Sequence, residues 1–171
     1  MKKWLSVILG IMLFAFSLVG CSTNSSGNGK NIEGTVEEIL QQIYEGLEDS
    51  SQLPFLTNIP LFEDIGEGND GRKISYYIGA KGIPFIEGIA SEAAIGGAYS
   101  VCLLRMENNA DIEKAKKDIK DNVDPNKWIC YTADTVIVDN IGDLVLLIMT
   151  NNQTAPGLGN AIYDSFKKLA K

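Results

Sequence analysis

Two apolar runs constrain the fold of this chain more than any other feature. They are VCLL at residues 101–104 and LVLLIM at residues 144–149. A strand with one face in water alternates apolar and polar side chains, and neither run alternates. We therefore expect two central strands that are covered on both faces. Either helices lie on both sides of the sheet, or one open face is a contact surface.

The segment before these runs opens with a helix signal. Thr35 and Glu38 have the spacing of a capping box, and apolar residues recur at helical spacing after them, so a helix is predicted over residues 35–48. Residues 49–75 are rich in Pro, Gly and acidic residues. We expect mostly loop there.

Strand and helix patterns then alternate to the end of the chain. Strands are predicted over residues 74–78, 84–90 and 98–106, followed by a helix that Asn109 can cap and that ends before Pro125. Residues 128–149 read as two strands joined at residues 139–142, and Pro156 opens a last helix. The order is a helix followed by two strand-strand-helix (ββα) units. It predicts an α+β domain with a mixed or antiparallel sheet and packed helices.

The first twenty residues have a different character from the rest. Lys2 and Lys3 precede an apolar stretch, Trp4 to Leu18, that is too short to span a membrane comfortably. A basic start followed by a short apolar region is typical of an export signal. Residues 1–20 are therefore predicted to be a cleaved signal peptide.

The end of this signal resembles the lipobox of bacterial lipoproteins. Residues 18–21 read LVGC, with a small glycine before the cysteine and small polar residues after it. The resemblance implies cleavage between Gly20 and Cys21, which makes Cys21 the mature N-terminus, and a diacylglyceryl thioether with palmitate-type acyl chains on Cys21. An uncleaved anchor helix or an ordinary secretory signal would not explain a cysteine at this spacing.

The lipobox also divides the rest of the chain. Residues 21–34 would be the acylated cysteine and a flexible tether rich in Ser, Asn and Gly, and residues 35–171 would be a single domain. Two or more acyl chains give durable attachment, so the plasma membrane is the expected partner of Cys21. We expect the protein at the extracellular face of the cell membrane.

Two further stretches resemble a domain of unknown function found in lipoproteins of Gram-positive bacteria. They are DIKDNVDPNKW at residues 118–128 and VDNIGDLVLLIM at residues 138–149, together with YYIG at 76–79 and IASEA at 89–93. The resemblance implies attachment at the cell surface and a small α+β fold. It brings no catalytic residues with it.

Charge excludes one class of partner. The formal net charge is −7 at pH 7, and loss of Lys2 and Lys3 with the signal makes the remaining chain more acidic. Such a domain is repelled by nucleic acid and by anionic lipid headgroups. We expect no nucleic-acid binding, and membrane affinity supplied by the lipid alone.

The sequence contains no histidine, which removes the commonest catalytic base and metal ligand. Ser165 and Lys168 match the bare Ser-x-x-Lys spacing of serine acyltransferases, but the companion motifs are missing. Gly157 and Gly159 at a helix start are weak candidates for anion binding. We predict no catalytic residue and no cofactor.

Two sets of carboxylates are candidates for calcium binding or glycoside hydrolysis. One set is Asp134, Asp139 and Asp143, and the other is Glu63, Asp64, Glu67 and Asp70. Neither has the fixed alternating spacing of a calcium loop. We interpret both as solvated loop charges and predict no metal site, although the loop of residues 63–70 stays open as a cation site.

Three residues in the predicted strands have two interpretations each. Cys102 and Cys130 are interpreted as buried thiols, with a disulfide between them as the alternative. Trp128 is interpreted as a core residue rather than as a binding-surface aromatic.

The functional expectation combines these points. We expect a non-catalytic binding or interaction module of the cell envelope, which contacts an envelope protein or a cell-wall component through its sheet or its acidic loop at residues 63–70. The alternative is a small envelope enzyme that uses paired carboxylates.

Overall fold

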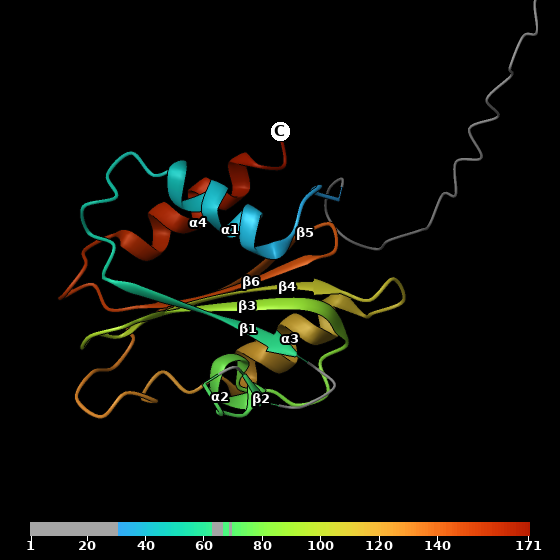
Figure 1. The fold of residues 1–171 in the computed structure, drawn as a ribbon, viewed down its shortest axis with the longest axis horizontal. Helices are drawn as coiled ribbons and strands as arrows, with labels where there is room; N and C mark the ends of the chain where they lie inside the picture. The colour runs from blue at the N-terminus through green and yellow to red at the C-terminus, as the bar shows by residue number, and fades with distance from the viewer. Residues whose placement is uncertain (1–30, 63–66, 69) are drawn as a thin grey trace, which may run out of the picture.

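The computed structural model describes residues 31–62, 67–68 and 70–171, and its elements are drawn in Figure 1. In chain order they are α1 (Val36–Glu45), β1 (Leu56–Phe62), β2 (Glu67–Gly68), α2 (Ile74–Ile78), β3 (Phe85–Ala93), β4 (Tyr99–Met106), α3 (Ile112–Asn122), β5 (Thr135–Ile141), β6 (Leu144–Thr150) and α4 (Leu158–Lys168). The predicted α+β domain is confirmed, with β3-β4-α3 and β5-β6-α4 as its two ββα units.

All strands belong to one antiparallel sheet in the order β2-β1-β3-β4-β6-β5. The two apolar runs of the sequence lie in β4 and β6, which pair with each other near the middle of the sheet. Every residue of β6 is buried, and so is almost every residue of β4. The predicted pair of central strands is confirmed.

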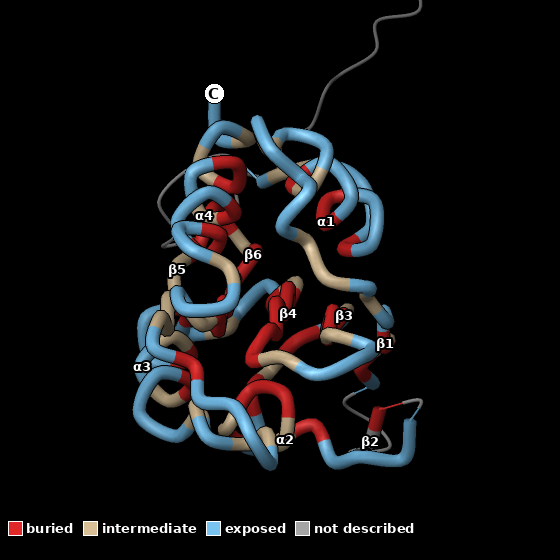
Figure 2. The backbone as a smooth tube through the Cα atoms, turned by 90° about the vertical axis from the view of Figure 1, so that its left-hand side faces the viewer, coloured by how far each residue is buried: buried red, intermediate tan, exposed pale blue. Residues whose placement is uncertain are grey.

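Helices cover both faces of the sheet. Figure 1 shows α1 and α4 above the strands and α2 and α3 below them, and Figure 2 shows the buried sides of these helices turned toward the sheet. Ile39, Ile162 and Phe166 are fully buried in the upper core, and Tyr77 and Ile119 in the lower core. Of the two expected arrangements, helices on both sides is the one adopted, so neither face of the central strands is an open contact surface.

Local capping fixes the starts of two helices. Thr35 Oγ1 accepts a hydrogen bond from the Glu38 N–H at 3.2 Å, and Glu38 Oε2 accepts one from the Thr35 N–H at 2.9 Å. This is the predicted capping box. At α3 the predicted cap Asn109 is wrong, because Asp111 Oδ1 accepts from the Lys114 N–H instead.

The largest errors of the sequence prediction fall between residues 49 and 78. The predicted loop contains β1, which pairs with β3 along its length and with β2 only at Leu61 and Phe62. Proline has no N–H to donate to a neighbouring strand. Pro60 is tolerated in β1 because most of the outer edge of β1 has no partner strand. The predicted strand over residues 74–78 is helix α2, in which Ile74, Tyr77 and Ile78 share the buried side. Burial at helical spacing outweighs the strand preference of these residues.

Residues 123–134 form a loop, although a strand was predicted from residue 128, and β5 begins only at Thr135. The β5–β6 turn lies at Gly142 and Asp143 rather than at residues 139–142, and Gly142 has a positive φ of 53°. Helix α4 begins at Leu158, after Gly157 in the left-handed conformation. These shifts move strand limits without changing the topology.

The sheet has two ends, which we call the base and the tip. At the base, Asn31–Gly34 lead into α1 beside the β5–β6 turn, and Figure 1 shows this end on the right. The tip comprises residues 46–55, 94–98, 123–134 and 151–157, which connect elements at the left of Figure 1. In the described part of the chain, no helix has the length and apolar character needed to cross a membrane.

Candidate functional site

A cavity of about 290 Å³ opens at the tip. Its walls are Tyr76 of α2, Ala93, Gly96 and Gly97 of the β3–β4 hairpin, and residues 127–131 of the loop before β5. Gly96 has a positive φ of 28°, which favours glycine, and it lies against Tyr131. The walls are therefore mainly aromatic and apolar.

A buried ion pair holds one wall of the cavity in place. Lys127 Nζ lies 2.8 Å from Glu92 Oε1, and the two side chains are only 3% and 8% exposed. Lys127 also donates to Ser100 Oγ at 3.1 Å, and Ser100 Oγ donates to Glu92 Oε1 at 2.6 Å. Each charge is thus compensated inside the protein, as a stable buried ion pair requires. The pair ties the loop of residues 123–134 to β3.

Aromatic rings surround the same ammonium group. Lys127 Nζ lies 4.7 Å from the ring centre of Tyr76, 5.6 Å from that of Tyr77 and 5.0 Å from that of Trp128. Cation–π attraction adds to the ion pair at this separation. Trp128 is half-buried and packs against the lower core, so its interpretation as a core residue is confirmed in part. It also lines the cavity, and its role as a binding-surface aromatic stays a prediction.

Sequence reasoning missed this ion pair. The available signal was Glu92, an acidic residue inside the otherwise apolar and small strand segment IASEA, because a carboxylate in a buried strand needs a partner. Nothing local identifies that partner as Lys127, which lies far along the chain and outside any regular element. The pairing depends on the path of the loop.

Large exposed apolar side chains lie on the tip segments, and we call Phe55, Ile95, Ile129 and Tyr131 the tip patch; Ile129 and Tyr131 also line the cavity. Ile129 is fully exposed, Phe55 is 82% exposed and Ile95 is 76% exposed. The Phe55 carbonyl accepts a hydrogen bond from the Ala94 N–H at 2.7 Å, and Gly96 lies against Tyr131. These contacts place the strand start, the hairpin and the loop side by side at the tip. Exposed apolar patches of this kind are typical of interaction sites.

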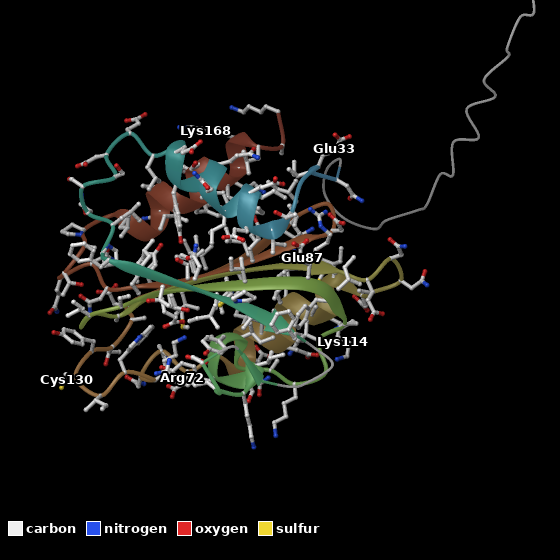
Figure 3. The ribbon with its side chains drawn as sticks, viewed as in Figure 1. Glu33, Arg72, Glu87, Lys114, Cys130 and Lys168 are labelled. Carbon is white, nitrogen blue, oxygen red and sulfur yellow. The ribbon has the colours of Figure 1, made fainter. Side chains whose placement is uncertain are left out.

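The two cysteines have different environments. Cys102 is buried in β4, but Cys130 is exposed at the tip, as its label in Figure 3 shows, and both are free thiols. The interpretation of Cys130 as a buried strand residue is wrong, because the loop turns it outward. The alternative of a disulfide between Cys102 and Cys130 is not formed in the structure.

Exposed charge at the tip is acidic. The exposed carboxylates of the tip segments are Glu48, Asp49, Asp124 and Asp134. Hydrogen bonds from the Ser51 hydroxyl and N–H lower the pKa of Asp49 below its usual range. Lys127 is the sole basic residue in these described segments, and its charge faces Glu92 in the interior. Two exposed cations lie beside these segments: Lys168 of α4 lines the same hollow as Glu48 and Asp49, and Arg72, which pairs with Asp70, lies 4.7 Å from the ring centre of Tyr76.

The base is held by Arg105 of β4. Its guanidinium donates to Asp143 Oδ2 at 3.0 Å, to the Ile32 carbonyl at 3.2 Å and to the Gly34 carbonyl at 2.7 Å. The Asp143 N–H donates to Asn31 Oδ1 at 3.2 Å. Residues 31–34 are thereby fixed against the β5–β6 turn, at the opposite end of the sheet from the cavity.

The carboxylates considered as a metal site or a catalytic pair lie in separate networks. Asp134 accepts hydrogen bonds from Asn152, and Asp143 pairs with Arg105. Burial alone would raise the pKa of Asp139, but hydrogen bonds from the Tyr163 hydroxyl, a main-chain N–H and Lys167 outweigh it, so that pKa lies below its usual range. Within the described residues, no group of three or more His, Cys, Asp or Glu side chains is arranged to hold a metal ion.

The second acidic set is only partly described. Glu63 and Asp64 lie outside the described residues, and so does the side chain of Glu67. Asp70 accepts hydrogen bonds from the Tyr77 hydroxyl and the Arg72 N–H, and it pairs with the Arg72 guanidinium at 3.0 Å. These contacts outweigh burial and lower the pKa of Asp70.

The remaining sequence candidates have structural contacts. Ser165 is buried and its hydroxyl donates to the Ile43 carbonyl at 2.7 Å, which ties α4 to α1. Lys168 is exposed one turn later. Gly159 lies where a Cβ would be 2.5 Å from Thr150 Oγ1, so close packing of α4 on the sheet explains it.

Comparisons with protein-family models, with curated protein sequences and with solved structures found no match to this chain. The predicted cleavage and lipidation residues, Gly20 and Cys21, lie outside the described residues.

Proposed function

We propose that this chain is a membrane-anchored extracellular lipoprotein whose folded domain is a non-catalytic binding module of the cell envelope. The anchor rests on the basic start, the apolar run and the LVGC sequence ending at Cys21. The resemblance of residues 118–128 and 138–149 to a domain of Gram-positive lipoproteins supports the same location. The lipid on Cys21 would attach the protein to the plasma membrane.

The proposed binding role rests on the separation between the base, where the tether would attach, and the tip, where the cavity opens. Arg105 fixes the segment that follows the tether at the base, and the cavity with its tip patch opens at the other end of the sheet. Strand β4 runs between them with 8 residues, a length of about 26 Å at the usual strand rise. A tether at the base leaves the apolar tip accessible from outside the membrane.

The lowered pKa values of three carboxyl groups favour a binding role over the alternative of an envelope enzyme. A carboxyl group that acts as a general acid near neutral pH needs a raised pKa. Among the described carboxylates, hydrogen bonds lower the pKa of Asp49, Asp70 and Asp139. The cavity at the tip is lined by aromatic and apolar groups rather than by a carboxylate pair.

Site-specific crosslinking on intact cells tests the binding role. A benzophenone maleimide attached to Cys130 places a photoreactive group at the tip, because Cys102 is buried and Cys21 would be blocked by lipid. The matched control is Cys130→Ser combined with Ile86→Cys, which moves the same label to an exposed position near the start of β3. We expect an envelope protein or cell-wall component to be captured from Cys130 and not from position 86. Equal capture from both positions, or from neither, would contradict a binding role for the tip.

The anchor has its own test. Cys21→Ala should leave the signal uncleaved or release the protein from the membrane, because the thiol that receives the lipid is missing. Radiolabelled palmitate incorporation and membrane fractionation measure this. Normal cleavage with unchanged membrane retention in Cys21→Ala would rule out the lipoprotein assignment while leaving the crosslinking result to stand alone.

A further inference from the structure

We infer that the tip cavity receives one large apolar or aromatic side chain from a protein segment that carries Lys or Arg on either side of it. The inference rests on the proposed binding function and names the chemistry of the partner. It follows from the size and neutrality of the cavity, the apolar rim around it and the charge of the tip.

The cavity suits a single side chain. Its volume of about 290 Å³ lies at the lower limit for small-molecule sites, which hold a whole ligand in about 300–1,000 Å³. Tyr76, Trp128 and Tyr131 provide aromatic walls. The one charged group in the wall, Lys127, is already compensated by Glu92 at 2.8 Å. An ionic headgroup would find no free opposite charge there, whereas an apolar group would replace water against aromatic surface.

The rim extends this contact beyond the cavity. Ile129 and Ile95 lie on the two segments that form the mouth, and Phe55 adjoins the hairpin through its carbonyl contact with Ala94. Protein interfaces commonly combine a central pocket for one anchoring side chain with a surrounding apolar rim that excludes water. A segment of extended chain lying across the tip would make both contacts together.

The negative charge of the tip favours basic residues on either side of the partner's apolar side chain. Asp124 and Asp134 are exposed in the same loop as Ile129. Complementary charge raises the rate and the specificity of association, so basic flanks are favoured and acidic flanks are disfavoured. The same carboxylates repel anionic lipid headgroups and nucleic acid.

Peptide selection tests the inference with the full chain in nanodiscs. A phage-displayed library of random twelve-residue peptides is selected on the wild-type protein, and the recovered peptides are synthesised and titrated against variants. Ile129→Ser removes an exposed rim residue, so folding should be preserved. Ile86→Ser is the matched control, because Ile86 is also an exposed isoleucine but lies near the start of β3. Insoluble peptidoglycan is used as a second probe in parallel.

We expect the recovered peptides to share a large apolar residue flanked by Lys or Arg. Their affinity should fall about tenfold or more in Ile129→Ser, as expected for loss of a buried aliphatic side chain, and stay unchanged in Ile86→Ser. Asp124→Asn should weaken binding about twofold to fivefold, with the difference lost at high salt. Glu107→Gln should leave binding unchanged, because Glu107 is exposed directly after β4, at the base.

Other outcomes separate the two proposals. Peptides that are acidic, that lack a large apolar residue or that bind Ile129→Ser as well as wild type would overturn the inference and leave the binding function standing. Binding to peptidoglycan that is lost in Ile129→Ser, with no recovered peptide, would identify a glycan-binding tip and overturn it as well. If wild type binds neither peptides nor peptidoglycan, both proposals fail.

Discussion

Lys127 reaches from the loop of residues 123–134 into the interior of the domain, where its Nζ lies 2.8 Å from Glu92 Oε1 on β3. The pair joins a long irregular segment to the sheet at the edge of the tip cavity. Trp128 to Tyr131, which follow Lys127 directly, form the outer wall of that cavity. The shape of the candidate binding site therefore depends on one buried ion pair.

Breaking this pair should destabilise the protein strongly. Lys127→Met leaves the Glu92 carboxylate buried with only the Ser100 hydroxyl as a donor, and we expect the free energy of unfolding to fall by about 3–5 kcal/mol. The double variant Lys127→Met with Glu92→Gln should lose less, because no uncompensated charge remains. Urea unfolding followed by fluorescence measures both. A loss below about 1 kcal/mol for the single variant would show that the pair is not buried in solution.

Arg105 at the base should not be replaceable by lysine. A lysine ammonium cannot contact Asp143, the Ile32 carbonyl and the Gly34 carbonyl with the geometry of the guanidinium. Arg105→Lys should lower the free energy of unfolding by about 1–3 kcal/mol and speed amide hydrogen exchange in residues 31–35.

The matched control for Arg105 is Arg72→Lys. The Arg72 side chain is about half exposed and pairs with Asp70, so its replacement should cost less than about 1 kcal/mol. Equal effects of the two substitutions would argue that Arg105 does not hold the start of the domain.

Asp139 should contribute to the loss of folding stability at acidic pH. Its pKa in the folded protein lies below the ordinary value of 3.8, because hydrogen bonds from Tyr163 and Lys167 and a main-chain N–H outweigh burial. The carboxylate therefore stabilises the fold above about pH 4, and this contribution is lost as the pH falls through the lowered pKa. Asp139→Asn should destabilise the protein at pH 7 more than at pH 3, as measured by urea unfolding.

A second carboxylate on α4 serves as the comparison for Asp139. Asp164 is exposed on the same helix as Tyr163 and Lys167. Asp164→Asn should change the free energy of unfolding little at either pH. If Asp139→Asn had the same effect at pH 3 as at pH 7, the hydrogen-bonded carboxylate would not be the source of the acid sensitivity.

The two described thiols should differ in reactivity by about 1,000-fold or more. Burial raises the pKa of Cys102 to about 12, despite the nearby Lys127, whereas Cys130 is exposed. In a Cys21→Ala chain at pH 8, Ellman's reagent should modify one thiol per native molecule and two after unfolding. Cys130→Ser should abolish the fast reaction. A fast reaction that persists in Cys130→Ser would place Cys102 within reach of solvent.

The central strands and the two repeated units were predictable because their signals are local. The VCLL and LVLLIM runs need cover on both faces wherever they lie, and β4 and β6 have it. Thr35 and Glu38 form their capping box from a spacing of three residues. The identity of the cap at Asp111 and the limits of β5 were missed because neighbouring polar residues offer nearly equivalent choices.

The candidate site was not predictable in the same way. Trp128 was identified as notable, but the loop that presents Ile129, Cys130 and Tyr131 was predicted as a strand. These residues have the composition of a strand, but they lie in a loop that the ion pair between Lys127 and Glu92 ties to β3. Helix α2 was missed for a related reason, since Tyr77 is buried by packing on the sheet and not by any helix preference of its own.

By itself the sequence determined the α+β class and the strands that lie at the centre, and it predicts the lipid anchor at Cys21, because each depends on residues that are close together along the chain. Tertiary structure alone decided that Glu92 pairs with Lys127, that Cys130 faces solvent and that Phe55 adjoins the β3–β4 hairpin. Each of these contacts joins segments from different parts of the chain. Their energies depend on burial and on relative position in space, and neither quantity exists until the sheet and its helices have assembled.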